Sequence, residues 1–196
     1  SSASDKATTL YPEAEAELLD RLGWATLARQ PRELSFITSF CKLTGAERID
    51  AEYFQPFCHR LRDHILKQGQ PLEAITHGFA KGTQPTSYCE TGPVFVVKSK
   101  NVTGHGVDFA ACSRTTNDAW ADKDARLADQ DLVINSTGRG TLGRADAIYG
   151  LCGQTVGSVD LVICRLDRTK IVPRYAALFF NSIAGITQSE QFQTGS

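Results

Sequence analysis

The sequence predicts an α+β fold in which helices flank a twisted, mixed β-sheet. Two short apolar runs, residues 94–97 and 132–134, are typical of buried strands, because each follows glycine, proline or polar turn residues. Two other stretches, residues 56–69 and 173–186, begin with proline, which is favoured in the first turn of a helix. Together these observations predict one domain of mixed α and β structure.

The N-terminal part of the chain is expected to lie outside the main domain. Residues 1–10 indicate a disordered lead-in or a remnant of cloning. Residues 11–33 predict a helix and a linker, because Leu18 and Leu22 fall on one helical stripe and Gly23 suits a helix C-cap. A helix this short and one-sided is not stable alone, so we expect it to pack on its own domain or to continue a helical spacer.

The main domain is predicted to span residues 34–196. Residues 34–43 alternate partly between apolar and polar side chains, which predicts an extended segment. In the predicted helix 56–69, Phe57 and Leu61 share an apolar face. Further strands are predicted at residues 107–110 and 154–165, and a short surface helix at residues 119–127.

The composition is that of an ordinary soluble globular protein and predicts no membrane partner. The 196 residues are 41% hydrophobic and 22% charged, and no apolar run approaches the roughly 20 residues that span a bilayer. Six cysteines are scattered without a C-x-x-C pair, which predicts free thiols in a reducing cytoplasm. The chain has no methionine, even at position 1, so we expect it to be a piece of a longer polypeptide.

The distribution of charge is more informative than its sum. A net charge of −1 excludes a generically basic nucleic-acid-binding protein. Basic side chains nevertheless outnumber acidic ones in residues 78–114, by four to two, and in residues 136–175, by six to three. A nucleic-acid face built from these two segments and an ordinary solvated surface explain charges of this size equally well.

A glycine-rich stretch follows the second predicted strand and carries the most distinctive chemistry of the chain. Gly138, Gly140 and Gly143 lie close together in sequence, which indicates a backbone with positive φ or a close approach by another group. Arg139 and Arg144 lie beside them, and arginine favours anionic partners. The stretch is therefore the first candidate for a binding site.

Two hypotheses for this stretch follow from the residues alone. Gly138, Gly140 and Gly143 match the G-x-G-x-x-G pattern of dinucleotide-binding loops, which requires a helix directly afterwards. Residues 144–153 are too rich in glycine for such a helix. Asp160 nevertheless follows the glycines by about the number of residues at which these loops have the acidic residue that binds the ribose. The alternative is a tight hairpin whose glycines serve geometry and whose arginines are solvated, and the residues favour it.

No catalytic, cofactor or metal site can be assigned from the sequence. His59 and His64 lie five positions apart on a predicted helix, whereas ligands on one helix face are spaced three or four apart. No Ser-His-Asp or Cys-His set stands out from the order of the residues. We therefore expect a non-catalytic chain with no catalytic residue, cofactor or metal of its own.

Four stretches occur in the order found in one protein family. The most specific is LADQDLVINSTGRGTLGR, residues 127–144, and the next is RIDAEYFQP, residues 48–56. The lysine-glycine and glycine-proline pattern of residues 81–107 and the final stretch from Pro173 complete the set. In this order they resemble the target recognition domain of the specificity subunit of type I restriction-modification systems. The resemblance covers residues 48–196.

The resemblance implies DNA recognition without catalysis. Each such domain reads one half of a split target in double-stranded DNA, while separate methyltransferase and restriction nuclease subunits methylate adenine and cleave the DNA. Residues 11–23 more loosely resemble the helical spacer of these subunits. The Asp-Pro-Pro-Tyr type motif of adenine methyltransferases is absent here, so the S-adenosylmethionine chemistry is expected on the partner chains. A fused methyltransferase-nuclease would use the same kind of domain and stays an alternative.

Base-reading residues vary between members of this family, so the candidates here are chosen by their chemistry. Arginine pairs with guanine and asparagine with adenine, while lysine contacts phosphates. Gly138, Gly140 and Gly143 are expected to shape the loop. The candidate DNA contacts are Lys81, Lys98, Lys100, Asn101, Arg114, Arg139 and Arg144.

Overall fold

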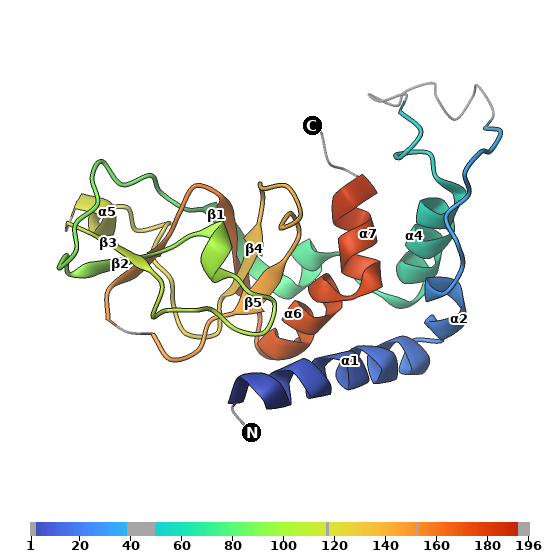
Figure 1. The fold of residues 1–196 in the computed structure, drawn as a ribbon, viewed down its shortest axis with the longest axis horizontal. Coiled ribbons are helices and arrows are strands. Elements are labelled where there is room, and N and C mark those ends of the chain that lie inside the picture. Colours follow the sequence, from blue (N-terminus) through green and yellow to red (C-terminus); the bar gives the residue numbers. More distant parts are fainter. Residues whose placement is uncertain (1–2, 39–49, 117, 152, 192–196) are drawn as a thin grey trace.

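Most of the helices lie to one side of the strands, in a mixed α+β fold (Figure 1). The computed structural model describes residues 3–38, 50–116, 118–151 and 153–191, which form six α-helices and two β-sheets. The helices are α1 (Ala3–Arg21), α2 (Ala25–Ala28), α4 (Pro56–Gln68), α5 (Asp118–Ala121), α6 (Pro173–Asn181) and α7 (Ile183–Gln191), with the 3-10 helices η1 (Leu72–Ile75) and η2 (Ser99–Asn101). The strands are β1 (Thr76–Lys81), β2 (Val94–Val97), β3 (Ser113–Thr115), β4 (Leu132–Asn135), β5 (Ala145–Ala147), β6 (Thr155–Gly157) and β7 (Leu161–Leu166).

Two sheets take the place of the single mixed sheet that the sequence predicts. Four strands form an antiparallel sheet in the order β1-β7-β4-β5, and three form a sheet in the order β3-β2-β6. In the smaller sheet, β2 pairs antiparallel with β3 and parallel with β6. Both sheets contribute to one core cluster, which includes the fully buried Val97, Val133, Leu161 and Ile163. The cluster joins the sheets into one folded unit.

Helix α6 packs on the four-stranded sheet. Leu132, Cys164 and Ala177 belong to the cluster between them. Because this sheet has core clusters on both faces, β4 shows a continuous apolar run where an alternating pattern would mark a half-exposed strand. The predicted buried strand at residues 132–134 is therefore confirmed, and its apolar run reflects packing on both faces of the sheet.

The N-terminal helices pack against α4, α6 and α7. Trp24, which is 2% exposed, shares a cluster with Phe57, Leu61 and Ala184. Helix α1 begins at Ala3, inside the stretch expected to be a lead-in, and α2 occupies part of the expected linker. Apolar side chains from before and after the predicted domain boundary thus share one cluster, so the boundary does not mark a break in the packing.

Most of the other predicted elements form. The predicted helix at residues 56–69 is α4, the predicted strand at 94–97 is β2, and residues 154–165 contain β6 and most of β7. Residues 34–38 of the predicted extended segment form no regular strand, and its last five residues lie outside the described ranges.

One predicted element is wrong, and another is shorter than predicted. Residues 107–110 form no strand and are joined to the chain before them by a single isolated bridge, Val102 to Val107. The predicted surface helix ends at Ala121, because the backbone that follows bonds to β6 instead. The N–H of Leu127, for example, donates to the carbonyl oxygen of Thr155 at 2.9 Å.

The predicted closing helix is two helices that meet at Ser182. The backbone of Ser182 is extended (ψ 166°), which ends α6, and α7 then begins at Ile183. Gly185 packs so closely on the preceding turn that a Cβ there would lie 2.3 Å from the carbonyl oxygen of Phe180. The junction therefore needs a residue without a side chain.

Gly185→Ala is expected to lower the free energy of unfolding by about 2 kcal/mol, because the added methyl group overpacks the junction. Urea unfolding followed by circular dichroism measures the loss. Ile186→Ala, at an exposed position on the same helix, is the control and is expected to cost about 1 kcal/mol or less. Equal losses in the two variants would contradict this account of the junction.

The cysteines differ in their expected reactivity. Cys58 and Cys164 are buried and Cys89 is exposed, all as free thiols. Burial raises the pKa of Cys164 to about 12, so little of its reactive thiolate forms at pH 8. We expect iodoacetamide at pH 8 to alkylate Cys89 in the native protein and to spare Cys164 until denaturant is added. Mass spectrometry of peptides tests this, and equal labelling of both thiols in the native protein would contradict it.

Candidate nucleic-acid interface

Several strands end or begin at one edge of the two sheets. β1 and β4 end there and β7 begins there, because Lys81 pairs with Val162 and Asn135 pairs with Leu161. β2 and β6 run parallel and end close by, since the chain just after β1 bridges to Ser158 just after β6. We call the segments that leave this edge the loop edge, and they are residues 81–83, 98–106, 136–144 and 158–160.

The glycine loop, residues 136–144, connects β4 to β5 at the loop edge. Gly138, Gly140 and Gly143 have φ of +103°, +75° and +78°, which residues with side chains rarely adopt. Gly143 also lies against α7, where a Cβ would be 2.2 Å from the hydroxyl oxygen of Ser189. The glycines therefore serve the shape of the loop and its contact with α7.

The stretch lacks the geometry of a dinucleotide-binding loop. Such a loop leads directly into a helix, whereas β5 follows Arg144 and none of residues 144–151 is helical. The N–H of Gly143 donates to the carbonyl oxygen of Asn135 at 2.9 Å, which closes the loop as part of a hairpin. The nucleotide-binding hypothesis is therefore abandoned.

The glycine loop presents two arginines. Arg139 is exposed at the turn, and Arg144 is half-buried at the base, where its guanidinium donates to the carbonyl oxygen of Gly140 at 3.3 Å. Neither arginine forms an ion pair with any residue of the described part of the chain. Both guanidinium groups thus keep donors for an external partner.

Helix η2 and its N-cap place Lys98 and Lys100 at the loop edge, whereas the side chain of Asn101, a candidate DNA contact, is buried. Lys100 is exposed, and the ammonium of Lys98 lies 3.7 Å from the ring centroid of Tyr88. Asn101 is 1% exposed, and its amide accepts the N–H of Lys98 at 2.9 Å and donates to the carbonyl oxygen of Asp108 at 3.3 Å. We therefore remove Asn101 from the candidate DNA contacts, because its amide holds the turn together.

The remaining two candidates are far apart along the sheets. Lys81 is exposed at the end of β1, at the loop edge. Arg114 lies in β3, pairs across the sheet with Phe95 and stacks its guanidinium 4.3 Å from the centroid of that ring. Arg114 thus lies at the centre of β3, an outer strand of the smaller sheet, and not at the loop edge.

The sequence predicts a turn at Gly104, His105 and Gly106, but the sequence predictions assigned neither this second loop nor the buried side chain that anchors it to a site. Residues 103–106 hold His105 exposed, with its ring centroid 4.3 Å from that of Tyr11 in α1. Asp146 in β5 is 1% exposed and accepts two backbone N–H groups of this loop. Burial raises the pKa of Asp146, while the N–H donors act in the opposite direction. The sequence signal is an aspartate between two alanines in a short strand.

A groove of about 470 Å³ lies between α1, the two loops and the α6–α7 pair. His105 and Arg144 border it from the loops, and Tyr11 borders it from α1. Glu15 and Glu190 border it as well, but both are engaged within the chain, one with the first N–H of α7 and the other with an arginine after α2. The groove therefore combines hydrogen-bond donors from both loops with a partly acidic wall.

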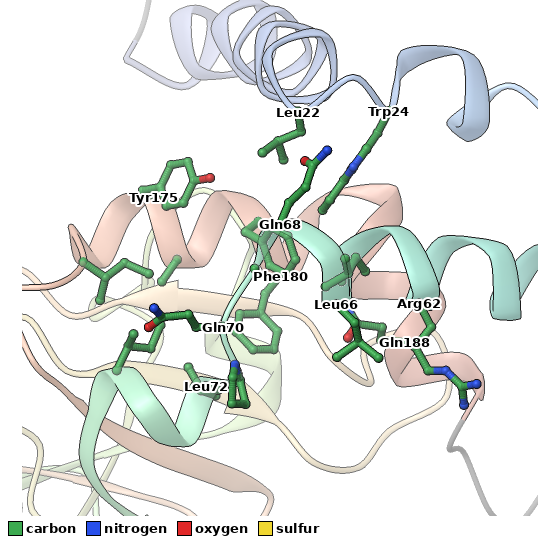
Figure 2. Close-up of a pocket in the computed structure, with 18 of the residues that line it drawn as sticks. Leu22, Trp24, Arg62, Leu66, Gln68, Gln70, Leu72, Tyr175, Phe180 and Gln188 are labelled. Carbon is green, nitrogen blue, oxygen red and sulfur yellow. The ribbon is translucent and has the colours of Figure 1, made fainter.

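A larger cavity of about 1010 Å³ lies among the helices, away from the loop edge. Figure 2 shows Trp24 at the upper right of the pocket and Tyr175 of α6 at its upper left, with Phe180 of α6 and Leu66 of α4 near its centre. Apolar side chains dominate its lining, and its charged members are Arg62 and Lys170. Among the described residues that line it there is no histidine, cysteine or acidic side chain.

The chemistry available at the loop edge is hydrogen-bond donation by cationic side chains. Among the described residues, no group of three or more histidine, cysteine or acidic side chains is placed to hold a metal ion. None of the helices in those ranges combines the length and apolar character needed to cross a membrane.

The comparisons with protein-family models and with curated proteins find no match to this chain.

Proposed function

We propose that this chain recognises double-stranded DNA, reading one half of a bipartite site as a target recognition domain of a type I restriction-modification specificity subunit. The observation that carries the proposal is the glycine loop, which presents Arg139 and Arg144 at the loop edge with no ion-pair partner in the part of the chain that the structure describes. Lys81, Lys98 and Lys100 lie on the same edge. The resemblance of residues 48–196 to target recognition domains also supports the proposal, and the glycine loop is part of its most specific stretch.

The chemistry of these side chains suits duplex DNA. A guanidinium donates two hydrogen bonds at once, to the O6 and N7 atoms of guanine in the major groove, and ammonium groups contact phosphates. The chain as a whole carries a net charge of −1, so any attraction to DNA must come from this local concentration of cations. We therefore expect binding that weakens steeply as salt rises, because phosphate contacts release counterions.

The proposal assigns catalysis to other chains. Methyltransferase subunits and a restriction nuclease subunit would modify adenine and cleave the DNA that this domain selects, in the cytoplasm. A fused methyltransferase-nuclease that carries this domain is the second candidate, since the same resemblance supports it. The two differ in the sequence beyond this chain and not in the proposed role of the loop edge.

Selection from a pool of random-sequence duplexes at low salt, followed by sequencing, tests the proposal. A short enriched motif is the expected result, and it would define the half-site. Competition with unlabelled random duplex separates base readout from phosphate attraction. An absence of duplex binding even at low salt would overturn the proposal.

A further inference from the structure

We propose that residues 103–106 form a second DNA-reading loop, which Asp146 and Asn181 position beside the glycine loop so that His105 and Arg144 act as one recognition unit. The inference rests on the proposed DNA-binding function and names the side chains that set its specificity. It assigns His105 to base contact and Asp146 and Asn181 to positioning.

The loop of residues 103–106 is a tight turn that holds His105 outward. Gly104 and Gly106 have φ of +89° and +133°. The hydroxyl of Thr103 donates to the carbonyl oxygen of Gly106 at 2.8 Å and accepts the N–H of His105 at 3.1 Å. The imidazole is exposed at the turn, and the Tyr11 ring meets it edge-on. The loop therefore displays one side chain in a defined place.

Asp146 ties this loop to β5. Its two carboxylate oxygens accept the N–H of Gly104 at 3.0 Å and the N–H of Gly106 at 2.8 Å. A carboxylate buried to 1% exposure is costly unless hydrogen bonds compensate, and these two offset part of that cost. β5 pairs with β4 through its backbone, so the sheet itself does not need the carboxylate. The acid therefore serves the loop.

Asn181, the last residue of α6, makes the second tie. Its amide oxygen accepts the N–H of Ala145 at 2.9 Å, and its amide nitrogen donates to the carbonyl oxygens of Ala145 and Gly104 at 2.7 and 3.1 Å. A Cβ on Gly104 would lie 3.7 Å from the Cγ of Arg144. The loop thus lies against the stem of Arg144, and hydrogen bonds join it to α6 and β5.

The paired side chains indicate which part of DNA the unit reads. The imidazole of His105 and the guanidinium of Arg144 both donate hydrogen bonds, and guanine presents two acceptors in the major groove. Glu15 borders the same groove and repels phosphates, which disfavours a purely backbone contact there, whereas the charge of Glu190 is paired with Arg32. The unit therefore favours a half-site that contains guanine. Positioning by buried hydrogen bonds sharpens such readout, because a loop fixed in advance loses less freedom on binding.

Asp146→Asn tests the positioning role in the full chain. An amide of the same shape accepts only one of the two N–H groups and turns its own NH₂ toward the other. We expect faster hydrogen exchange, measured by NMR, at Gly104 and Gly106, and about a tenfold drop in guanine enrichment in the selected DNA pool. Affinity for random duplex at low salt is expected to change less than about twofold, because the loop-edge cations stay in place.

Two further variants complete the test. His105→Ala should lose the same base preference without faster exchange at the loop. Asp167→Asn is the matched control, since that carboxylate also accepts a backbone N–H, from Thr169, but lies just after the far end of β7. If the wild type selects a motif and Asp146→Asn and His105→Ala select it equally well, this inference fails while the proposed function stands. If the wild type binds no duplex, both the inference and the proposed function fail. Unchanged hydrogen exchange at Gly104 and Gly106 in Asp146→Asn would contradict the positioning role of Asp146.

Discussion

Replacing Asp131 with alanine is expected to destabilise the folded chain by about 3 kcal/mol, because it leaves a partly buried arginine without its counter-charge. Asp131 is 5% exposed and forms an ion pair with Arg165 of β7, and its carboxylate also accepts the N–H of Ala128 at 2.7 Å. The guanidinium of Arg165 donates to the carbonyl oxygens of Asp124 and Arg126 at 3.0 and 2.6 Å. The pair thus holds the turn before β4 and the segment between α5 and that turn against the centre of the larger sheet.

The expected loss is at the lower end of what removal of one member of a buried pair costs, because Arg165 keeps some contact with solvent. Burial also lowers the pKa of Arg165, because its charge is partly removed from water, while the nearby charge of Asp124 acts in the opposite direction.

Urea unfolding of Asp131→Ala, monitored by circular dichroism, measures the effect. Asp129→Ala removes an exposed carboxylate two positions away and is the control, with an expected change within about 0.5 kcal/mol. In the double variant with Arg165→Ala, part of the loss should be recovered relative to the sum of the single losses, since no unpaired charge is left. Strict additivity of the two substitutions would show that the ion pair does not contribute as argued.

The elements that the sequence predicts well are those whose burial leaves a local pattern. β2 and β4 are continuous apolar runs because they lie between packed layers, and α4 carries its apolar residues on one face. The incorrect strand at residues 107–110 has a similar apolar appearance for another reason. Val107 and Phe109 pack on the core from a loop, so their hydrophobicity reflects burial and not strand pairing.

The division into two sheets could not be predicted from local patterns. It depends on the parallel pairing of β2 with β6, which joins residues about 60 positions apart, such as Val96 and Val156. The split between α6 and α7 depends likewise on the extended backbone at Ser182 and on the close packing of Gly185. Such features arise from tertiary contacts, which override local propensity.

The candidate site shows the same division between local and distant information. The glycine loop was found because three glycines and two arginines occur within seven residues. The second loop was not assigned to a site because Asp146 reaches N–H groups that precede it by 40 and 42 positions. Asn101 was chosen by residue type, which cannot reveal that its amide is already bonded to the backbone of Lys98 and Asp108.

Replacing Arg139 and Arg144 together with alanine is expected to weaken duplex DNA binding about 30-fold or more at low salt. The reason is that an arginine contact to a base edge or a phosphate contributes at least about 1 kcal/mol, and two such losses multiply in the binding constant. The dependence of the logarithm of affinity on the logarithm of salt should also become shallower, by about one for each arginine that neutralises a phosphate. Both arginines lack ion-pair partners among the described residues, so their removal should cost less than about 1 kcal/mol of folding stability.

The matched control is the double variant Arg29→Ala and Arg168→Ala, which removes the same charge from two exposed positions away from the loop edge. Fluorescence anisotropy with a labelled duplex, measured at several salt concentrations, compares the two variants. Because general Coulomb attraction depends on net charge, an equal loss in both would mean that the glycine loop makes no direct contact with DNA. A selective loss in Arg139→Ala/Arg144→Ala, with an unfolding curve close to that of the wild type, would mean that these two guanidinium groups bind the duplex themselves.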